Sequence, residues 1–175
     1  MKKLLVCLLT LCALTFSSCN PDPEPIPEPT NYADDFVGEY IFSITPTVVS
    51  EEYGSIVNEY DGLICKITET YTNNVSVSIY QGSSLVYRVG GLCDASGMRL
   101  GESEFGFSLQ EYVDGILVTL DGESELGGVY VKKPVGGTIS WVAPITSANI
   151  EFVIENITVD AGTVTGSVAF KGERI

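Results

Sequence analysis

The sequence predicts an all-β protein, and three observations support that prediction. From Asp35 to the C-terminus the apolar residues alternate with polar ones, which is the spacing of strands that bury one face. No window in this region has the period of a helix, and Gly, Thr, Ser, Val and Ile dominate it. Short turn signals separate the alternating runs, which indicates that the strands are connected locally.

The alternating runs give the expected strands in chain order. They lie at 36–44, 63–67, 75–79, 105–109, 116–120, 129–131, 139–141, 150–154 and 164–170. We expect about eight to ten strands, and a sheet of that size without covering helices either curls into a barrel or splits into two packed layers.

The turn signals favour an antiparallel meander, in which neighbours in sequence are neighbours in the sheet. Asp114-Gly115 is the strongest signal, because a type I′ turn needs two residues that accept a positive φ. Gly90 to Ser103, the longest irregular stretch, is expected to form a flap. The favoured architecture is a closed β-barrel, and the alternative is a β-sandwich. The other expected turns are Asn73-Asn74, Gln81 to Ser84, Asp121-Gly122 and Pro134 to Gly137.

Residues 1–18 resemble a lipoprotein signal peptide. Lys2 and Lys3 precede an apolar run, Leu4 to Phe16, that is shorter than the ~18–20 residues of a membrane span. The run ends in Ser17-Ser18-Cys19, an order similar to the bacterial lipobox, in which a diacylglycerol thioether forms on the cysteine and cleavage makes it the N-terminus. The resemblance implies that acylated Cys19 attaches the protein to a membrane. An ordinary secretory signal is the alternative.

Residues 19–34 combine the lipidated cysteine with a proline-rich tether. The stretch holds five of the eight prolines, and alternating proline forbids helix and ladder pairing, so it extends by about 3.1 Å per residue. Its acidic residues resemble a surface-export signal of some Gram-negative lipoproteins, and Asn20 is not the aspartate that resembles an inner-membrane retention signal. We therefore expect an outer-membrane protein facing the periplasm or the cell surface, with residues 35–175 as its folded domain. A solvated spacer with no targeting role is the alternative.

Charge excludes one class of partner. After the signal, seven basic residues stand against 23 acidic ones, a net charge of −16. Nucleic-acid affinity depends on clustered Lys and Arg, so no nucleic acid is expected as a partner. The same charge repels anionic lipid head groups, so membrane attachment depends on the acyl chains. The sequence leaves the oligomeric state open.

The start of the predicted domain, Phe36-Val37-Gly38-Glu39-Tyr40, resembles the Gly-x-Tyr or Gly-x-Trp opening of lipocalin-like and calycin-like β-barrels. The resemblance implies a barrel around a cavity that takes a small apolar or amphipathic molecule. It carries over no ligand-specific residue.

Inward strand positions supply the candidate ligand-binding residues. Bulky side chains there either line a pocket or fill the barrel, which at about eight strands is small enough for either. Glu69 continues an inward face and is expected to orient a polar group of a ligand, unless it reaches solvent at a strand end. The candidates are Tyr40, Phe42, Glu69, Phe107, Trp141 and Phe152.

Histidine is absent from the chain, which removes the usual general base and most zinc sites. Chemistry based on two carboxylates remains open, but the acidic residues fall mostly at turns and outward positions. Asp121 to Glu125 lacks the ligand spacing of a calcium loop. We therefore expect no enzyme, no cofactor and no metal site.

Aromatic residues suggest a different binding mode. In a β-sandwich, Tyr80, Tyr87, Tyr130 and Trp141 would form an exposed row on which a glycan stacks. Core packing explains the same rings, and a purely structural cell-envelope protein is a third alternative.

Cys65 and Cys93 are the cysteines that remain after processing and acylation. An exported chain meets oxidising conditions, so a disulfide between them is a candidate. Two small buried thiols are the alternative.

Overall fold

The computed structural model describes residues 30–50, 54–113, 116–154, 157–160 and 164–175. The compact unit starts at Asn31. The folded domain therefore includes residues 31–34, which were predicted to belong to the tether, in addition to residues 35–175. Among the described residues, no helix has both the length and the apolar character needed to cross a membrane.

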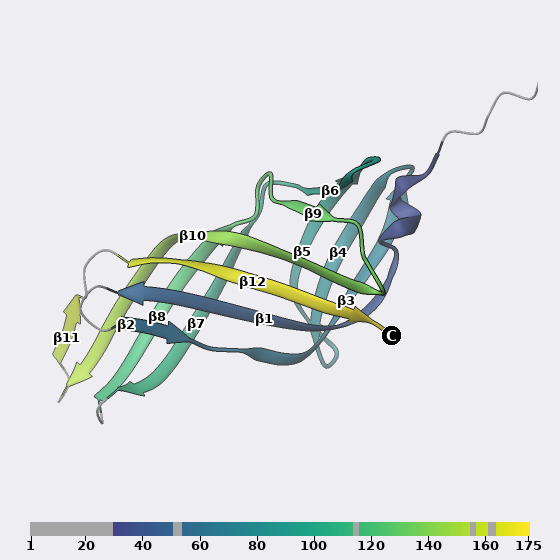
Figure 1. The fold of residues 1–175 in the computed structure, drawn as a ribbon. Coiled ribbons are helices and arrows are strands. Elements are labelled where there is room, and N and C mark those ends of the chain that lie inside the picture. Colours follow the sequence, from purple (N-terminus) through teal and green to yellow (C-terminus); the bar gives the residue numbers. More distant parts are fainter. Residues whose placement is uncertain (1–29, 51–53, 114–115, 155–156, 161–163) are drawn as a thin grey trace, which may run out of the picture. The chain divides into compact units, whose positions relative to one another are not determined.

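One turn of 3-10 helix and twelve strands make up the unit, with the labels of Figure 1. Their bounds are η1 (Tyr32–Asp35), β1 (Gly38–Ser50), β2 (Gly54–Val57), β3 (Tyr60–Tyr71), β4 (Asn74–Gln81), β5 (Ser84–Cys93), β6 (Gly97–Leu100), β7 (Glu104–Val113), β8 (Ile116–Glu125), β9 (Tyr130–Lys132), β10 (Thr138–Ile154), β11 (Ile157–Asp160) and β12 (Val164–Arg174).

All the strands belong to one antiparallel sheet that curls into a half-barrel (Figure 1). The all-β prediction is confirmed, and the described strands form one continuous sheet rather than two separate layers. The order is β7-β8-β10-β12-β1-β3-β4-β5-β6-β9, with β2 beside β1 and β11 beside β10. This order departs from the predicted meander, because β12 returns to pair with β1 and β9 pairs with β6 instead of with its neighbours in sequence.

Most of the predicted turns are confirmed. Asn73 and Gly82 have positive φ values of 63° and 59° between consecutive paired strands. Gly136 and Gly137 also have positive φ values, 61° and 83°, in a tight turn before β10 across which Val135 pairs with Thr138. The Asp114-Gly115 turn lies outside the described residues, but Val113 pairs with Ile116, as a two-residue hairpin requires.

The turn predicted at Asp121-Gly122 is wrong. Both residues lie inside β8, where Gly122 pairs with Phe107 of β7. A Cβ on Gly122 would lie 2.4 Å from the Phe107 ring, so this glycine makes room for an aromatic side chain that crosses the strand.

The flap predicted from Gly90 to Ser103 is also wrong. Most of it belongs to β5 and β6, which pair as a hairpin. The Asp94 carboxylate closes the turn by accepting hydrogen bonds from the backbone amides of Ser96 and Gly97, at 2.8 and 3.0 Å. An Asx turn of this kind satisfies the backbone locally, so a flap is not needed.

Aromatic side chains fill the middle of the half-barrel. Trp141 of β10 stacks on Phe170 of β12, with ring centroids 5.0 Å apart, and Phe42 of β1 lies 5.2 Å from Trp141. Phe105 of β7 meets Phe170 and Tyr87 edge-on, at 5.4 Å from each. The edge strand β7 therefore packs across the concave side of the sheet, against strands that are distant from it in the strand order.

Candidate functional site

Three of the predicted ligand-binding residues form part of the core. Tyr40, Phe42 and Trp141 are buried, with at most 4% of any of them exposed. The Tyr40 hydroxyl donates to the carbonyl of Phe36 at 2.7 Å, and Phe42 and Trp141 belong to the aromatic cluster. Phe42 also borders a hollow of about 200 Å³ that Asp61 and Lys171 share, and none of the three residues lines the apolar hollow described below.

The remaining candidates lie in different places. Phe107 is buried in β7 and lines the hollow described below. Glu69, expected to point inward, is exposed near the end of β3 and accepts a hydrogen bond from Asn31 at 2.9 Å. Phe152 pairs with Val118 in the strand register, and its side chain lies outside the described residues, as does Cys19.

The candidate disulfide between Cys65 and Cys93 is not formed, and the alternative of two buried thiols holds. Both are buried and carry free thiols. Cys65 pairs with Ile79, which pairs with Tyr87, and Cys93 lies six residues further along β5 than Tyr87. Six strand residues span about 20 Å, whereas a disulfide requires Cα atoms within about 7 Å. Burial raises the pKa of Cys65 to about 12 and that of Cys93 to about 11, so neither thiol is a ready nucleophile.

An apolar hollow of about 240 Å³ opens where β7 approaches β3, β4 and β5, and we call it the slot. Its floor is apolar, because Ile44 and Leu63 are almost fully buried beneath it. The residues that line it are Ile44, Tyr60, Leu63, Gln81, Val86, Phe105, Gly106, Phe107 and Ser108.

A bulge in β3 positions two of the slot residues. Phe42 pairs with Leu63 and Ile44 pairs with Tyr60, so β3 has one residue more than β1 between these pairs. Gly62 absorbs the extra residue with a φ of 68°, a conformation that glycine adopts at no steric cost. As a result Tyr60 and Leu63, three residues apart, both line the slot.

A second bulge positions Val86. Ile79 pairs with Tyr87 and Tyr80 pairs with Leu85, which leaves Val86 without a partner on β4. An unpaired bulge residue is free to change direction, and Val86 turns toward the slot with 49% of its surface exposed.

The hydroxyl of Tyr60 closes the slot at its edge. It donates to the backbone carbonyl of Ser108 on β7. Burial raises the pKa of Tyr60, so the group stays protonated and keeps its proton to donate near neutral pH. This contact joins β7, at the edge of the sheet, to β3. Among the slot residues, Gln81 is the one with a side-chain amide, and it is exposed.

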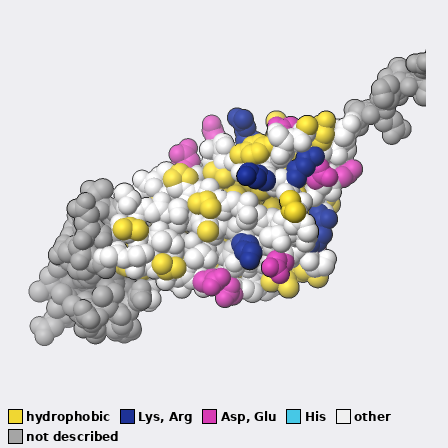
Figure 2. Space-filling view, viewed as in Figure 1, with side chains coloured by type: hydrophobic (Ala, Val, Ile, Leu, Met, Phe, Trp, Pro, Cys, Tyr) yellow, Lys and Arg dark blue, Asp and Glu magenta, His cyan; other side chains and the backbone are white. Residues whose placement is uncertain are grey.

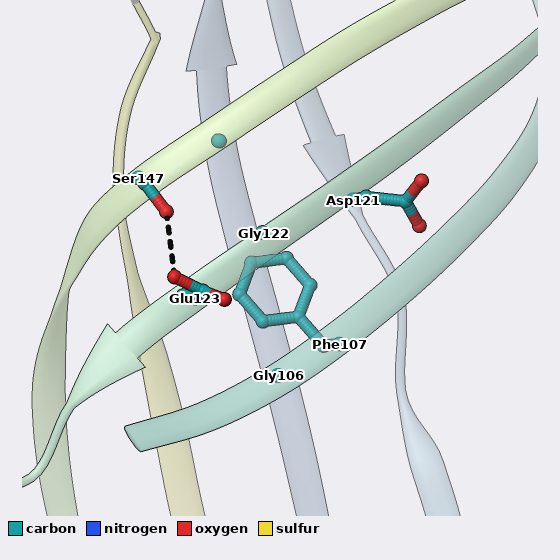
Figure 3. A pocket seen from close by; sticks show the side chains of 7 residues that line it. Gly106, Phe107, Asp121, Gly122, Glu123 and Ser147 are labelled. Atoms are coloured by element: carbon teal, nitrogen blue, oxygen red, sulfur yellow. Dashed lines mark hydrogen bonds between the residues drawn. The ribbon is translucent and has the colours of Figure 1, made fainter.

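A second, more polar hollow of about 440 Å³ lies over β7, β8 and β10 (Figure 3). In this view the Phe107 ring lies across Gly122, and Glu123 accepts a hydrogen bond of 3.2 Å from the Ser147 hydroxyl. Asp121 and Glu123 are its charged groups, and both are exposed. Among the described residues, no three His, Cys, Asp or Glu side chains are grouped closely enough to hold a metal ion.

The predicted row of exposed rings does not form. Trp141 is buried, and the half-buried Tyr87 packs on Phe105 and donates to the Ser103 hydroxyl at 2.6 Å. The slot instead depends on Tyr60 and Val86, and alternation of apolar and polar residues predicts neither as an inward side chain. Asp61-Gly62, a dipeptide typical of turns, is the local sequence signal that the alternation breaks near Tyr60.

No known protein family, curated protein or solved structure matches the chain in the comparisons made.

Proposed function

We propose that this protein is a membrane-anchored lipoprotein that binds a small apolar or amphipathic molecule without transforming it. The observation that supports the proposal is the slot: a hollow with an apolar floor on the concave side of a curled sheet. Within this proposal the half-barrel is a lipocalin-like barrel, and the slot lies at the edge where β7 approaches β3.

The proposed anchor is acylated Cys19, joined to the fold by the proline-rich stretch that ends at Asn31. Asn31 is held firmly where the fold begins: its side-chain oxygen accepts from the amides of Ala33 and Asn73, at 3.3 and 3.1 Å. Fatty-acid labelling of the wild type, lost in Cys19→Ala, is the expected result. Labelling that survives the substitution contradicts the anchor.

The side chains that line the slot are suited to binding rather than to catalysis. No carboxylate or thiol lines it, and its polar groups are the Tyr60 hydroxyl, the Gln81 amide and the Ser108 backbone and hydroxyl. Such groups orient a ligand by hydrogen bonds but provide no acid–base pair.

Thermal shift and mass spectrometry test the binding proposal. Solvent extraction of the natively purified protein is expected to release a small apolar molecule, and added lipids are expected to raise the melting temperature, because a ligand that binds only the folded state stabilises it. Val86→Trp fills the slot and is expected to abolish the shift.

Val142→Trp is the matched control, because Val142 is a comparably exposed strand valine, 60% exposed, that does not line the slot. This variant is expected to keep the shift. A shift from soluble glycans with no effect of lipids, or equal behaviour of the two variants, contradicts the proposal.

A structural envelope role is the second candidate, and the filled interior favours it. Phe42, Phe105, Trp141 and Phe170 occupy the volume that a barrel-centred ligand would need. In that case the slot variant and its control melt alike with every lipid, which separates the two candidates.

A further inference from the structure

We propose that the slot selects uncharged amphiphiles of about eight carbons and discriminates against anionic ones such as fatty acids. The inference rests on the proposed binding function and adds the chemical class of the ligand. Two properties of the slot support it: the residues that line it carry no charge, and its volume suits a short chain.

None of the nine residues that line the slot is charged. The described fold contains seven Lys and Arg residues, and three of the lysines already face acidic partners: Lys66 with Glu39 at 2.7 Å, Lys133 with Asp35 at 2.7 Å and Lys171 with Glu173 at 3.9 Å. The Arg174 guanidinium donates hydrogen bonds to the Val37 carbonyl and the Tyr40 hydroxyl, at the start of β1. The slot therefore offers no cation to a carboxylate or phosphate.

The sequence neighbours of the slot residues add no cation. Glu59 and Asp61 flank Tyr60, and Glu104 precedes the buried Phe105 and so lies on the opposite face of β7. Asp61 borders a separate hollow that Lys171 also lines. Figure 2 shows one face of the fold, on which Lys and Arg side chains lie among acidic ones. An anionic head group at the slot would lose part of its hydration with no ion pair in return.

An uncharged head group has partners at the same place. The Gln81 amide is exposed and provides two donors and an acceptor. The tail would lie on Ile44, Leu63 and Phe107, which are buried. An apolar cavity of about 150 Å³ takes the six carbons of benzene, so a hollow of about 240 Å³ has room for about eight carbons.

Titration of the full domain with 1-octanol and octanoate at pH 8 tests the inference, because the two probes share a chain length and differ in charge. We expect octanol to bind at least tenfold more tightly than octanoate. Gln81→Lys places a cation at the slot and is expected to raise octanoate affinity at least tenfold with little change for octanol.

Gln110→Lys is the matched control, because it adds the same charge at an exposed glutamine that does not line the slot. It is expected to leave the preference for octanol unchanged. Equal affinities in the wild type, or an equal gain of octanoate affinity in both lysine variants, overturn the selectivity while leaving ligand binding intact. Failure of both probes to bind any variant overturns the binding function itself.

Discussion

Arg174, at the end of the last strand, holds the ring of Tyr40 at the beginning of the first. The guanidinium carbon lies 5.4 Å from the centroid of the ring, and Nη2 donates to the Tyr40 hydroxyl at 2.9 Å. The same nitrogen donates to the carbonyls of Asp35 and Val37, at 3.1 and 3.0 Å. One side chain thereby joins η1, β1 and β12, which brings the two ends of the fold together.

Loss of this contact is expected to destabilise the fold. Arg174→Ala removes the hydrogen bonds and the cation–π contact and is expected to lower the free energy of unfolding by about 1–2 kcal/mol. Arg174→Lys keeps the charge but not the planar donor group, so it is expected to recover only part of the loss. Urea unfolding measures both variants. Full recovery by lysine would show that charge alone matters.

A side chain at Gly62 is expected to destabilise the fold, although space for it is available. A Cβ there meets nothing within 4 Å, so the cost of Gly62→Ala comes from the φ of 68° alone and is expected to be about 1–2 kcal/mol. Gly90→Ala is the control: its Cβ also meets nothing, and it needs no positive φ. Equal unfolding midpoints for the two variants would argue against the bulge.

A side chain at Gly122 is expected to destabilise the fold for the opposite reason, lack of space. Gly122→Ala places a Cβ against the Phe107 ring and is expected to cost about 1–3 kcal/mol. Gly106→Ala, on the paired strand, adds a Cβ with nothing within 4 Å and is expected to be close to neutral. Thermal unfolding compares the pair. If Gly106→Ala costs as much as Gly122→Ala, the crossing of the ring is not the cause.

Asp94 is expected to make stability depend on pH in the acid range. Hydrogen bonds from the Ser96 side chain and from the amides of Ser96 and Gly97 lower the pKa of Asp94 from 3.8 to about 2. A carboxyl whose pKa is lower in the folded state stabilises the fold above about pH 4, and this contribution is lost as the pH falls toward 2.

Unfolding of wild type and Asp94→Asn across this range checks the prediction. The wild type is expected to be the more stable at pH 6, and the difference is expected to shrink between pH 4 and pH 2. Ser96→Ala removes the hydroxyl donor and is expected to move the loss to higher pH. Parallel curves for wild type and Asp94→Asn would contradict the assignment.

The sequence predicts the parts of this fold that follow a strict alternation. The paired strands and the turns at Asn73 and Gly82 follow from side-chain periodicity and positive φ alone. Strand order does not, because nothing local records that β12 pairs with β1. The slot escapes prediction for a related reason: the bulges at Gly62 and Val86 break the alternation, and a one-residue shift moves side chains to the other face of a strand.

The misplaced predictions have equally specific causes. Gly122 reads as a turn because glycine is common there, but in this fold it makes room for a ring on the neighbouring strand. Tyr40 reads as a ligand contact because it is large and faces inward. Its hydroxyl is instead occupied by Phe36 and Arg174, which depends on residues far away in the sequence.

Intermolecular NOEs between 1-octanol and the methyl groups of the protein test the central claim, ligand binding in the slot, most directly. The account predicts NOEs from the octanol chain to Ile44 and Leu63, which form the floor of the slot, and none to Ile41 or Val142, which are exposed elsewhere. The Val86→Trp variant is expected to lose these NOEs. NOEs confined to Ile41 and Val142, or no NOEs at a saturating octanol concentration, would contradict it.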